Sequence, residues 1–152
     1  MKWLTYLPPL LLLASCAAHG RHEEEKPSAT ATAQVGIVNH TGNFIYSASV
    51  DGAGGGNMAR WGAGGANVCC TSIPRVWQSG MKVLVRWDMP EGHTHNVKEK
   101  IIEVEKYDRP GDIYMHFFPN DEVRVVVSNA SGYSKKHPIP PSDPPTNSQP
   151  KN

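Results

Sequence analysis

The sequence has no excess of charge of either sign. Among 152 residues, Lys and Arg together number 15 and Asp and Glu number 14, so the formal net charge is +1. A nucleic-acid-binding domain needs a clustered basic surface, and electrostatic docking on anionic lipid needs a polybasic segment. We therefore expect no nucleic-acid partner and no recruitment to a membrane by charge alone.

The sequence also lacks an apolar run long enough to cross a bilayer, which takes about 20 residues. Its longest run, residues 10–13, follows Lys2 and leads into Leu13-Ala14-Ser15-Cys16. A basic start, a short apolar stretch and small residues before a cysteine are typical of a lipoprotein signal peptide. We expect cleavage before Cys16, lipid on its thiol, and a place in the outer membrane facing the periplasm, because residue 17 is Ala and not Asp.

Cysteine is scarce, with three in the chain. Once Cys16 carries lipid, Cys69 and Cys70 are the only thiols left, and zinc would need further ligands that the sequence does not pair with them. Adjacent Cα atoms lie about 3.8 Å apart, whereas disulfides prefer about 4.4–6.8 Å. Our order of expectation is buried thiols, then a vicinal disulfide, then an intermolecular bond. We expect no metal, no cofactor and no catalytic residue.

No window of ten residues carries a helical apolar stripe, and the pattern of the middle of the chain is that of strands. Alternating apolar residues, separated by Gly, Pro, Asn and Asp turns, predict an all-β fold. We expect an antiparallel β-sandwich or open barrel of about seven short strands. The expected strands are residues 35–38, 43–50, 67–73, 81–87, 96–107, 112–118 and 122–128.

The two ends of the chain have few apolar residues, which predicts segments that do not pack. Residues 1–15 form the expected signal peptide, and residues 16–33 the lipidated cysteine with a flexible tether. Residues 34–133 form the expected β-domain. Residues 134–152, which are rich in proline, form the expected disordered tail.

A glycine-rich stretch at residues 51–67 has seven glycines but no helix behind it and no Lys-Ser or Lys-Thr pair, so it is not a phosphate-binding loop. It is either a mobile loop or a set of backbone bends that lets a partner approach. Arg60 and Trp61 lie within it. An exposed Trp beside an Arg is typical of a protein–protein contact, and a buried Trp is the alternative.

A second candidate contact is the turn that carries His93 and His95. With His116 they would make three imidazole ligands for a metal, but the flanking Gly92 and Thr94 favour a solvated turn. We therefore treat His93 and His95, like Arg60 and Trp61, as candidate partner-binding residues. No Gly-x-Ser-x-Gly motif or other catalytic pattern is present.

Several segments resemble a family of uncharacterised bacterial lipoproteins, over residues 34–129. The adjacent cysteines in Cys69-Cys70-Thr71-Ser72-Ile73-Pro74 are the most specific part of the match, and His40 departs from it where an aromatic Tyr is expected. Members are often encoded beside phospholipase effectors of type VI secretion. The other matching segments are Gly36-Ile37-Val38-Asn39-His40-Thr41, the Val50-Asp51-Gly52 turn, Val83-Leu84-Val85-Arg86-Trp87, Val104-Glu105-Lys106-Tyr107 and Gly111-Asp112-Ile113-Tyr114-Met115-His116-Phe117.

The resemblance implies an immunity protein that binds and neutralises a secreted phospholipase without being an enzyme itself. The alternative is a structural or accessory envelope lipoprotein that binds glycan or another envelope component. A phospholipase gene next door would favour the first, and capture on carbohydrate the second.

Overall fold

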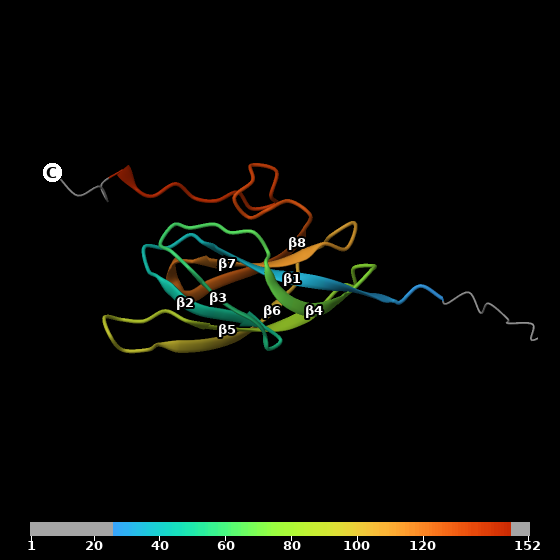
Figure 1. Ribbon diagram of the computed structural model, residues 1–152, viewed down its shortest axis with the longest axis horizontal. Helices are drawn as coiled ribbons and strands as arrows, with labels where there is room; N and C mark the ends of the chain where they lie inside the picture. Colours follow the sequence, from blue (N-terminus) through green and yellow to red (C-terminus); the bar gives the residue numbers. More distant parts are fainter. Residues whose placement is uncertain (1–25, 147–152) are drawn as a thin grey trace, which may run out of the picture.

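In a computed structural model, residues 26–146 are described, and they form two four-stranded β-sheets packed face to face (Figure 1). Sheet 1 has the strand order β4-β1-β7-β8, and sheet 2 the order β3-β2-β5-β6. The expected all-β sandwich is confirmed. The strands are β1 (Thr30–Asn39), β2 (Ile45–Val50), β3 (Ala53–Met58), β4 (Val68–Pro74), β5 (Lys82–Asp88), β6 (Val97–Glu103), β7 (Asp112–Phe118) and β8 (Glu122–Ser128), and a 3-10 turn, Pro119–Asp121, joins the last two.

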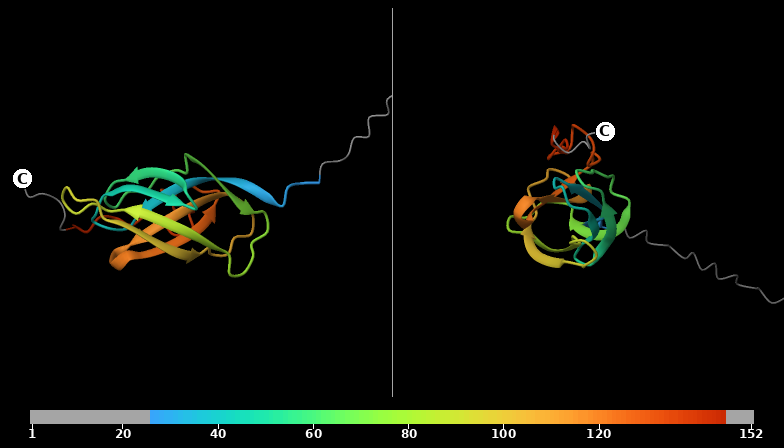
Figure 2. Two further views of the ribbon diagram at one scale, coloured as in Figure 1. Left: turned by 90° about the horizontal axis from the view of Figure 1, so that it is seen from below. Right: turned by 90° about the vertical axis from the view of Figure 1, so that its left-hand side faces the viewer.

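Strand pairing is antiparallel except between β1 and β7, which run parallel. Consecutive strands make hairpins from β2 to β3, from β5 to β6 and from β7 to β8. This arrangement puts the end of β1, the start of β2 and the β5–β6 turn at one end of the sandwich. The chain before β1 joins at the other end (Figure 2).

The core lies between the sheets and is built by the alternation of apolar residues along the strands. Val83, Val85 and Trp87 point inward from sheet 2, and Trp87 packs on Phe117 with ring centroids 5.6 Å apart. From sheet 1 the inward residues include the alternating apolar residues of the last two strands. These are Ile113, Met115 and Phe117 in β7 and Val123, Val125 and Val127 in β8, all in the buried core.

An eighth strand, β3, lies where the sequence predicted a mobile glycine-rich loop. Gly54 explains why glycine is needed there: its φ is +114°, and a Cβ would lie 2.9 Å from the carbonyl oxygen of Ala48 on the paired strand. Glycine adopts this backbone conformation at little cost, and side-chain-bearing residues do not. The glycine run therefore encodes an irregular edge strand.

The outer face of sheet 1 is covered by the chain itself. Val38, Tyr114 and Val126 point away from the core and form a second buried apolar cluster with Ile139. Figure 1 shows the segment after β8 lying over this sheet. The prediction of an unpacked tail is therefore wrong for this part of the C-terminal segment, where His137 and Ile139 are buried. Residues 147–152 lie outside the described part.

The N-terminal boundary also differs from the prediction. β1 begins at Thr30, and Ala33 is fully buried against the core, so residues 30–33 belong to the domain and not to the tether. Gly36, further along β1, lets the Tyr114 ring lie directly on the strand, because a Cβ there would be 2.4 Å from that ring. The predicted signal peptide and Cys16 lie outside the described residues. Within residues 26–146 no helix is long and apolar enough to cross a membrane.

Candidate functional site

Two of the sequence-predicted loops meet at one end of the sandwich, here called the distal end, which comprises residues 40–46, 58–62 and 88–97. The hairpin connections place all three segments there, opposite the point where the chain enters β1 (Figure 2). Loops held on a rigid sheet frame are the usual carriers of binding residues. Arg60, Trp61, His93 and His95 all belong to the distal end.

The loop that carries Arg60 and Trp61 is fixed by the buried side chain of Asn39. Its amide nitrogen donates to the carbonyl oxygens of Asn43 at 2.7 Å and Ala59 at 2.9 Å, and its amide oxygen accepts from the backbone N–H of Thr41 at 3.0 Å. A single buried amide thus ties the turn after β1 to the turn after β3. These hydrogen bonds tie the loop down, which favours the second of our two alternatives for the glycine-rich stretch, a set of backbone bends, over a mobile loop.

Trp61 is held in an unusual backbone conformation. Its φ is +55°, its N–H donates to the Thr41 carbonyl oxygen at 3.0 Å, and its ring lies against Gly42. A bulky aromatic residue in the left-handed region is uncommon, and such strain clusters at functional sites. Trp61 is half-buried and Arg60 is exposed. The pair therefore combines a fixed aromatic ring with a free guanidinium.

The second loop is a tight hairpin turn whose side chains are partly structural. The Asp88 carboxylate is buried at the end of β5, where it accepts from the Asn96 N–H at 3.0 Å and pairs with His95 Nδ1 at 2.5 Å. The His95 ring packs edge-on against Tyr46 at 5.0 Å. His93 stands exposed at the tip, next to Gly92.

Exposed aromatic and aliphatic side chains complete the distal end. Phe44, Tyr46 and Val97 are 40%, 55% and 46% exposed. Aromatic residues and Arg are the side chains that contribute most at protein interfaces. The structure therefore gathers the four predicted partner-binding residues around exposed apolar groups. It does not bring His116 to His93 and His95, because His116 is buried in the middle of sheet 1.

The feature that sequence reasoning missed is a hydrogen-bonded chain of three buried histidines on the outer face of sheet 1. His40 Nε2 lies 2.9 Å from His116 Nδ1, and His116 Nε2 lies 3.0 Å from His137 Nε2. At one end His40 Nδ1 lies 2.6 Å from the Ser142 hydroxyl, and at the other His137 Nδ1 lies 2.8 Å from the Ala130 carbonyl oxygen. These hydrogen bonds connect the end of β1, strand β7 and the C-terminal segment.

The carbonyl at one end fixes the direction of every bond. A carbonyl only accepts, so His137 carries its proton on Nδ1 and accepts from His116 at Nε2. His116 then accepts at Nδ1 from the Nε2–H of His40, and His40 accepts at Nδ1 from the Ser142 hydroxyl. All three rings are neutral and all five groups are satisfied. A proton added to His116 or His137 would set two donors against each other, whereas one added to His40 would make the Ser142 hydroxyl the acceptor.

Burial also opposes protonation of the three histidines. It lowers the pKa of His116 from 6.5 to about 3, with smaller contributions from His137, His40 and Arg124. Burial also lowers the pKa of His40, assisted by Arg124 and His137. It lowers the pKa of His137 too, although the hydrogen bond to Ala130 raises it. Burial therefore favours the neutral forms of all three histidines.

The Ser142–His40 contact has the atoms of a nucleophile–base pair but not its setting. In hydrolytic triads a carboxylate stabilises the imidazolium that forms during reaction. Here the third group is neutral His116, and burial disfavours a charged His40. Among residues 26–146, no group of three or more His, Cys, Asp or Glu side chains is arranged to hold a metal ion. The histidine chain is therefore suited to holding the C-terminal segment on sheet 1.

Cys69 and Cys70 are joined by a vicinal disulfide, and neither is buried, which corrects our expectation of buried thiols. The pairing of β1 with β4 explains how adjacent residues can meet. Cys69 and Cys70 together stand opposite the single residue Gln34, so β4 has a β-bulge there. A bulge breaks the alternation that would turn neighbouring side chains to opposite faces. The flanking pairs are Ala33 with Thr71 and Val35 with Val68.

One feature of the sequence indicates that the outer face carrying the histidine chain is covered. Residues 112–118 alternate between core residues and Tyr114, His116 and Phe118, which are too large and apolar, taken together, for a face in water. This pattern indicates a strand covered on both faces. Ile139, between two prolines, was the matching apolar residue in the C-terminal segment.

Comparison with known proteins identifies a family without a known activity. A family model described as "Protein of unknown function (DUF3304)" matches residues 38–125, more than half of the chain. No curated protein and no solved structure matches the chain. The matched range holds both distal loops, His40 and His116, and it ends before His137.

Proposed function

The chain belongs to the DUF3304 family of proteins of unknown function, and we propose that it binds and neutralises a phospholipase delivered by type VI secretion. In this proposal, lipid on Cys16 holds the protein in the outer membrane, facing the periplasm. The observation that carries it is the distal end, where the half-buried Trp61 and the exposed Arg60 lie at the same end of the sandwich as the exposed Phe44 and Tyr46.

The placement of that surface suits an anchored inhibitor. The chain enters the domain at the end opposite the distal end. Residues 17–29, between Cys16 and β1, can span at most roughly 45 Å when extended. The distal end therefore points away from the attachment point and can meet an enzyme that arrives at the membrane. Confinement to the same surface raises the effective concentration of inhibitor near that enzyme.

Inhibition by such a protein needs no chemistry of its own. A standard interface of about 1,600 Å² reaches nanomolar affinity when it contains a few well-buried anchor residues. Covering the mouth of the active site or the membrane-binding face of a lipase is sufficient. We assign the anchor role to Trp61 and Tyr46, and the orienting charge to Arg60.

The test is protection of living cells. A phospholipase effector encoded beside this gene, as the family resemblance implies, is exported to the periplasm with and without the lipoprotein, and survival is measured. We expect survival with the parent protein and loss of protection with the Arg60→Ala/Trp61→Ala double variant. A matched control is Lys135→Ala/Tyr133→Ala, which removes an exposed cation and an exposed aromatic residue away from the distal end.

Two results would reject the proposal. One is death of cells that carry the parent protein at the same rate as cells without it, with no complex between the purified proteins. The other is equal loss of protection with the two double variants. The accessory role in binding glycan or another envelope component would then take its place.

A further inference from the structure

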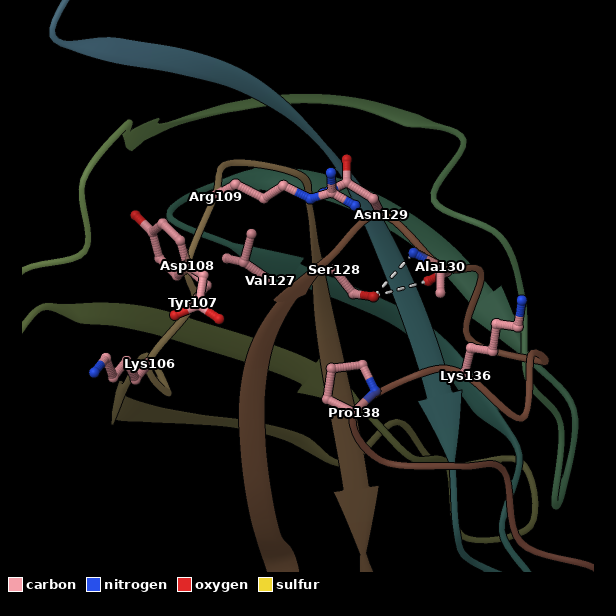
Figure 3. A pocket seen from close by; sticks show the side chains of 10 residues that line it. All are labelled: Lys106, Tyr107, Asp108, Arg109, Val127, Ser128, Asn129, Ala130, Lys136 and Pro138. Carbon is pink, nitrogen blue, oxygen red and sulfur yellow. Dashed lines mark hydrogen bonds between the residues drawn. The ribbon is translucent and has the colours of Figure 1, made fainter.

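A groove of about 540 Å³ lies at the end of the sandwich where β1 begins, far from the distal end (Figure 3). One wall is the connector between β6 and β7, with Lys106, Tyr107 and Arg109. The other is the C-terminal segment, with Lys136 and Pro138. The end of β8 forms the floor. The groove has the size of a small-molecule site.

The charge of the groove stands out in a chain of almost no net charge. Three cations, Lys106, Arg109 and Lys136, line it with one acid, Asp108. Within the described chain, none of these three cations forms an ion pair or a side-chain hydrogen bond, whereas Lys98, Arg86 and Arg124 each pair with an acid elsewhere. Figure 3 shows Arg109 extended across the groove towards Asn129, with Lys106 and Lys136 on either side.

The wall from the C-terminal segment is held in place by the histidine chain. His137, between Lys136 and Pro138, donates from Nδ1 to the carbonyl oxygen of Ala130 at 2.8 Å, and Ala130 lines the groove. The N–H of Ala130 in turn donates to the Ser128 hydroxyl at 3.0 Å. The same bonds that fasten the segment therefore fix the backbone of one wall and of the floor of the groove.

We propose that this groove is a binding site for a small ligand that carries a phosphate group. The Arg109 guanidinium can bind two oxygens of a phosphate, and Lys106 and Lys136, at opposite edges of the groove, add positive charge around it. The volume exceeds that of phosphate alone, and the exposed Pro138 offers apolar surface to the rest of the ligand. A phospholipid headgroup and a free phosphate share this chemistry, and the chain continues from this end towards Cys16.

The experiment is isothermal titration of the full-length protein in a non-ionic detergent, at constant ionic strength, with two probes. Inorganic phosphate represents the free anion, and glycerophosphoglycerol represents the headgroup of an anionic phospholipid. We expect saturable binding of at least one probe at one site per chain. Tighter binding of glycerophosphoglycerol assigns the site to a headgroup, and tighter binding of phosphate to the free anion.

Single variants separate a built site from general attraction to positive charge. Arg109→Gln and Lys136→Gln each remove one lining cation, and we expect about five- to tenfold weaker binding. Lys135→Gln is the matched control, because it removes the same charge from the neighbouring residue, which does not line the groove. We expect less than about a twofold change there.

The proposal is overturned if neither probe binds saturably, or if Lys135→Gln weakens binding as much as Lys136→Gln. It does not depend on the proposed function. Its failure would leave protection against a phospholipase untouched, because Lys106, Arg109 and Lys136 lie outside the distal end.

Discussion

The two sheets differ in what covers their outer faces. On sheet 1, Val38, Tyr114 and His116 are buried beneath the loop after β3 and the C-terminal segment. On sheet 2, the cross-strand neighbours Leu84 and Ile101 are 41% and 70% exposed. Both faces carry apolar side chains, so composition alone does not tell them apart.

Because of this difference, one outer face is closed by the chain itself and the other is open to a partner. The covered face is completed internally, with every imidazole nitrogen of the histidine chain in a hydrogen bond. The open face continues into the distal end through Tyr46 and Val97, which are also exposed. A face that is already satisfied gains little from a partner, and an exposed apolar face gains buried area. We therefore expect partners on the side of sheet 2 and the distal end.

The largest expected effect comes from breaking the covered face at its centre. His116→Leu keeps the volume but leaves the His40 N–H without an acceptor and His137 without a donor. Each unsatisfied buried group costs about 1–3 kcal/mol, so we expect the free energy of unfolding to fall by about 4 kcal/mol. Urea denaturation at pH 7 measures it. A loss below about 1 kcal/mol would show that the histidine chain does not stabilise the domain.

Acid should weaken the same face in the parent protein. The pKa of His116 is about 3 in the folded state and 6.5 when unfolded, so the unfolded chain binds more protons between these values. Stability is complete above about pH 7 and falls by about 1.4 kcal/mol per pH unit below 6.5. At pH 4 we expect a loss of about 3 kcal/mol from this group. His116→Leu should show a flatter pH dependence, and an equal dependence would contradict the assignment.

Ile139 tests the packing of the C-terminal segment without touching a hydrogen bond. It is 9% exposed and contacts the cluster on sheet 1. We expect Ile139→Ala to reduce the free energy of unfolding by about 2 kcal/mol, at the low end for a buried aliphatic residue. The control is Val76→Ala, since Val76 is 77% exposed and should change stability by less than about 0.5 kcal/mol. Equal effects would mean that the segment is not held.

How much of this fold the sequence predicts depends on the type of pattern. Seven strands were predictable because residues such as Val83, Val85 and Trp87 alternate with polar ones. β3 was not, because glycines have no apolar periodicity and their role depends on a paired strand. The packing of His137 and Ile139 was not predictable either. A single apolar residue among prolines shows no periodicity, and only the folded structure shows which sheet face it covers.

The candidate site likewise has parts that the sequence predicts and parts that it does not. Arg60, Trp61, His93 and His95 could be placed on loops because the glycines around them predict turns, and their role in binding a partner stays a prediction. The histidine chain was missed because its members, His40, His116 and His137, are far apart in sequence and no spacing links them. Only the parallel pairing of β1 with β7 and the return of the C-terminal segment bring them together.

The smallest effect is expected on the open face. Leu84→Ser/Ile101→Ser removes a cross-strand apolar pair that is exposed to solvent. Such a pair contributes about 0.2–1 kcal/mol, and the free energy of unfolding should change by no more than that. A loss above about 2 kcal/mol would show that this face is covered in solution, for instance by a second copy of the chain.

Hydrogen–deuterium exchange of the protein alone and mixed with a type VI phospholipase effector maps the surface that the proposed partner would cover. We expect new protection at residues 42–46, 58–62 and 89–97, with exchange at residues 129–142 unchanged. Protection confined to residues 129–142, or to the outer face of sheet 1, would contradict it.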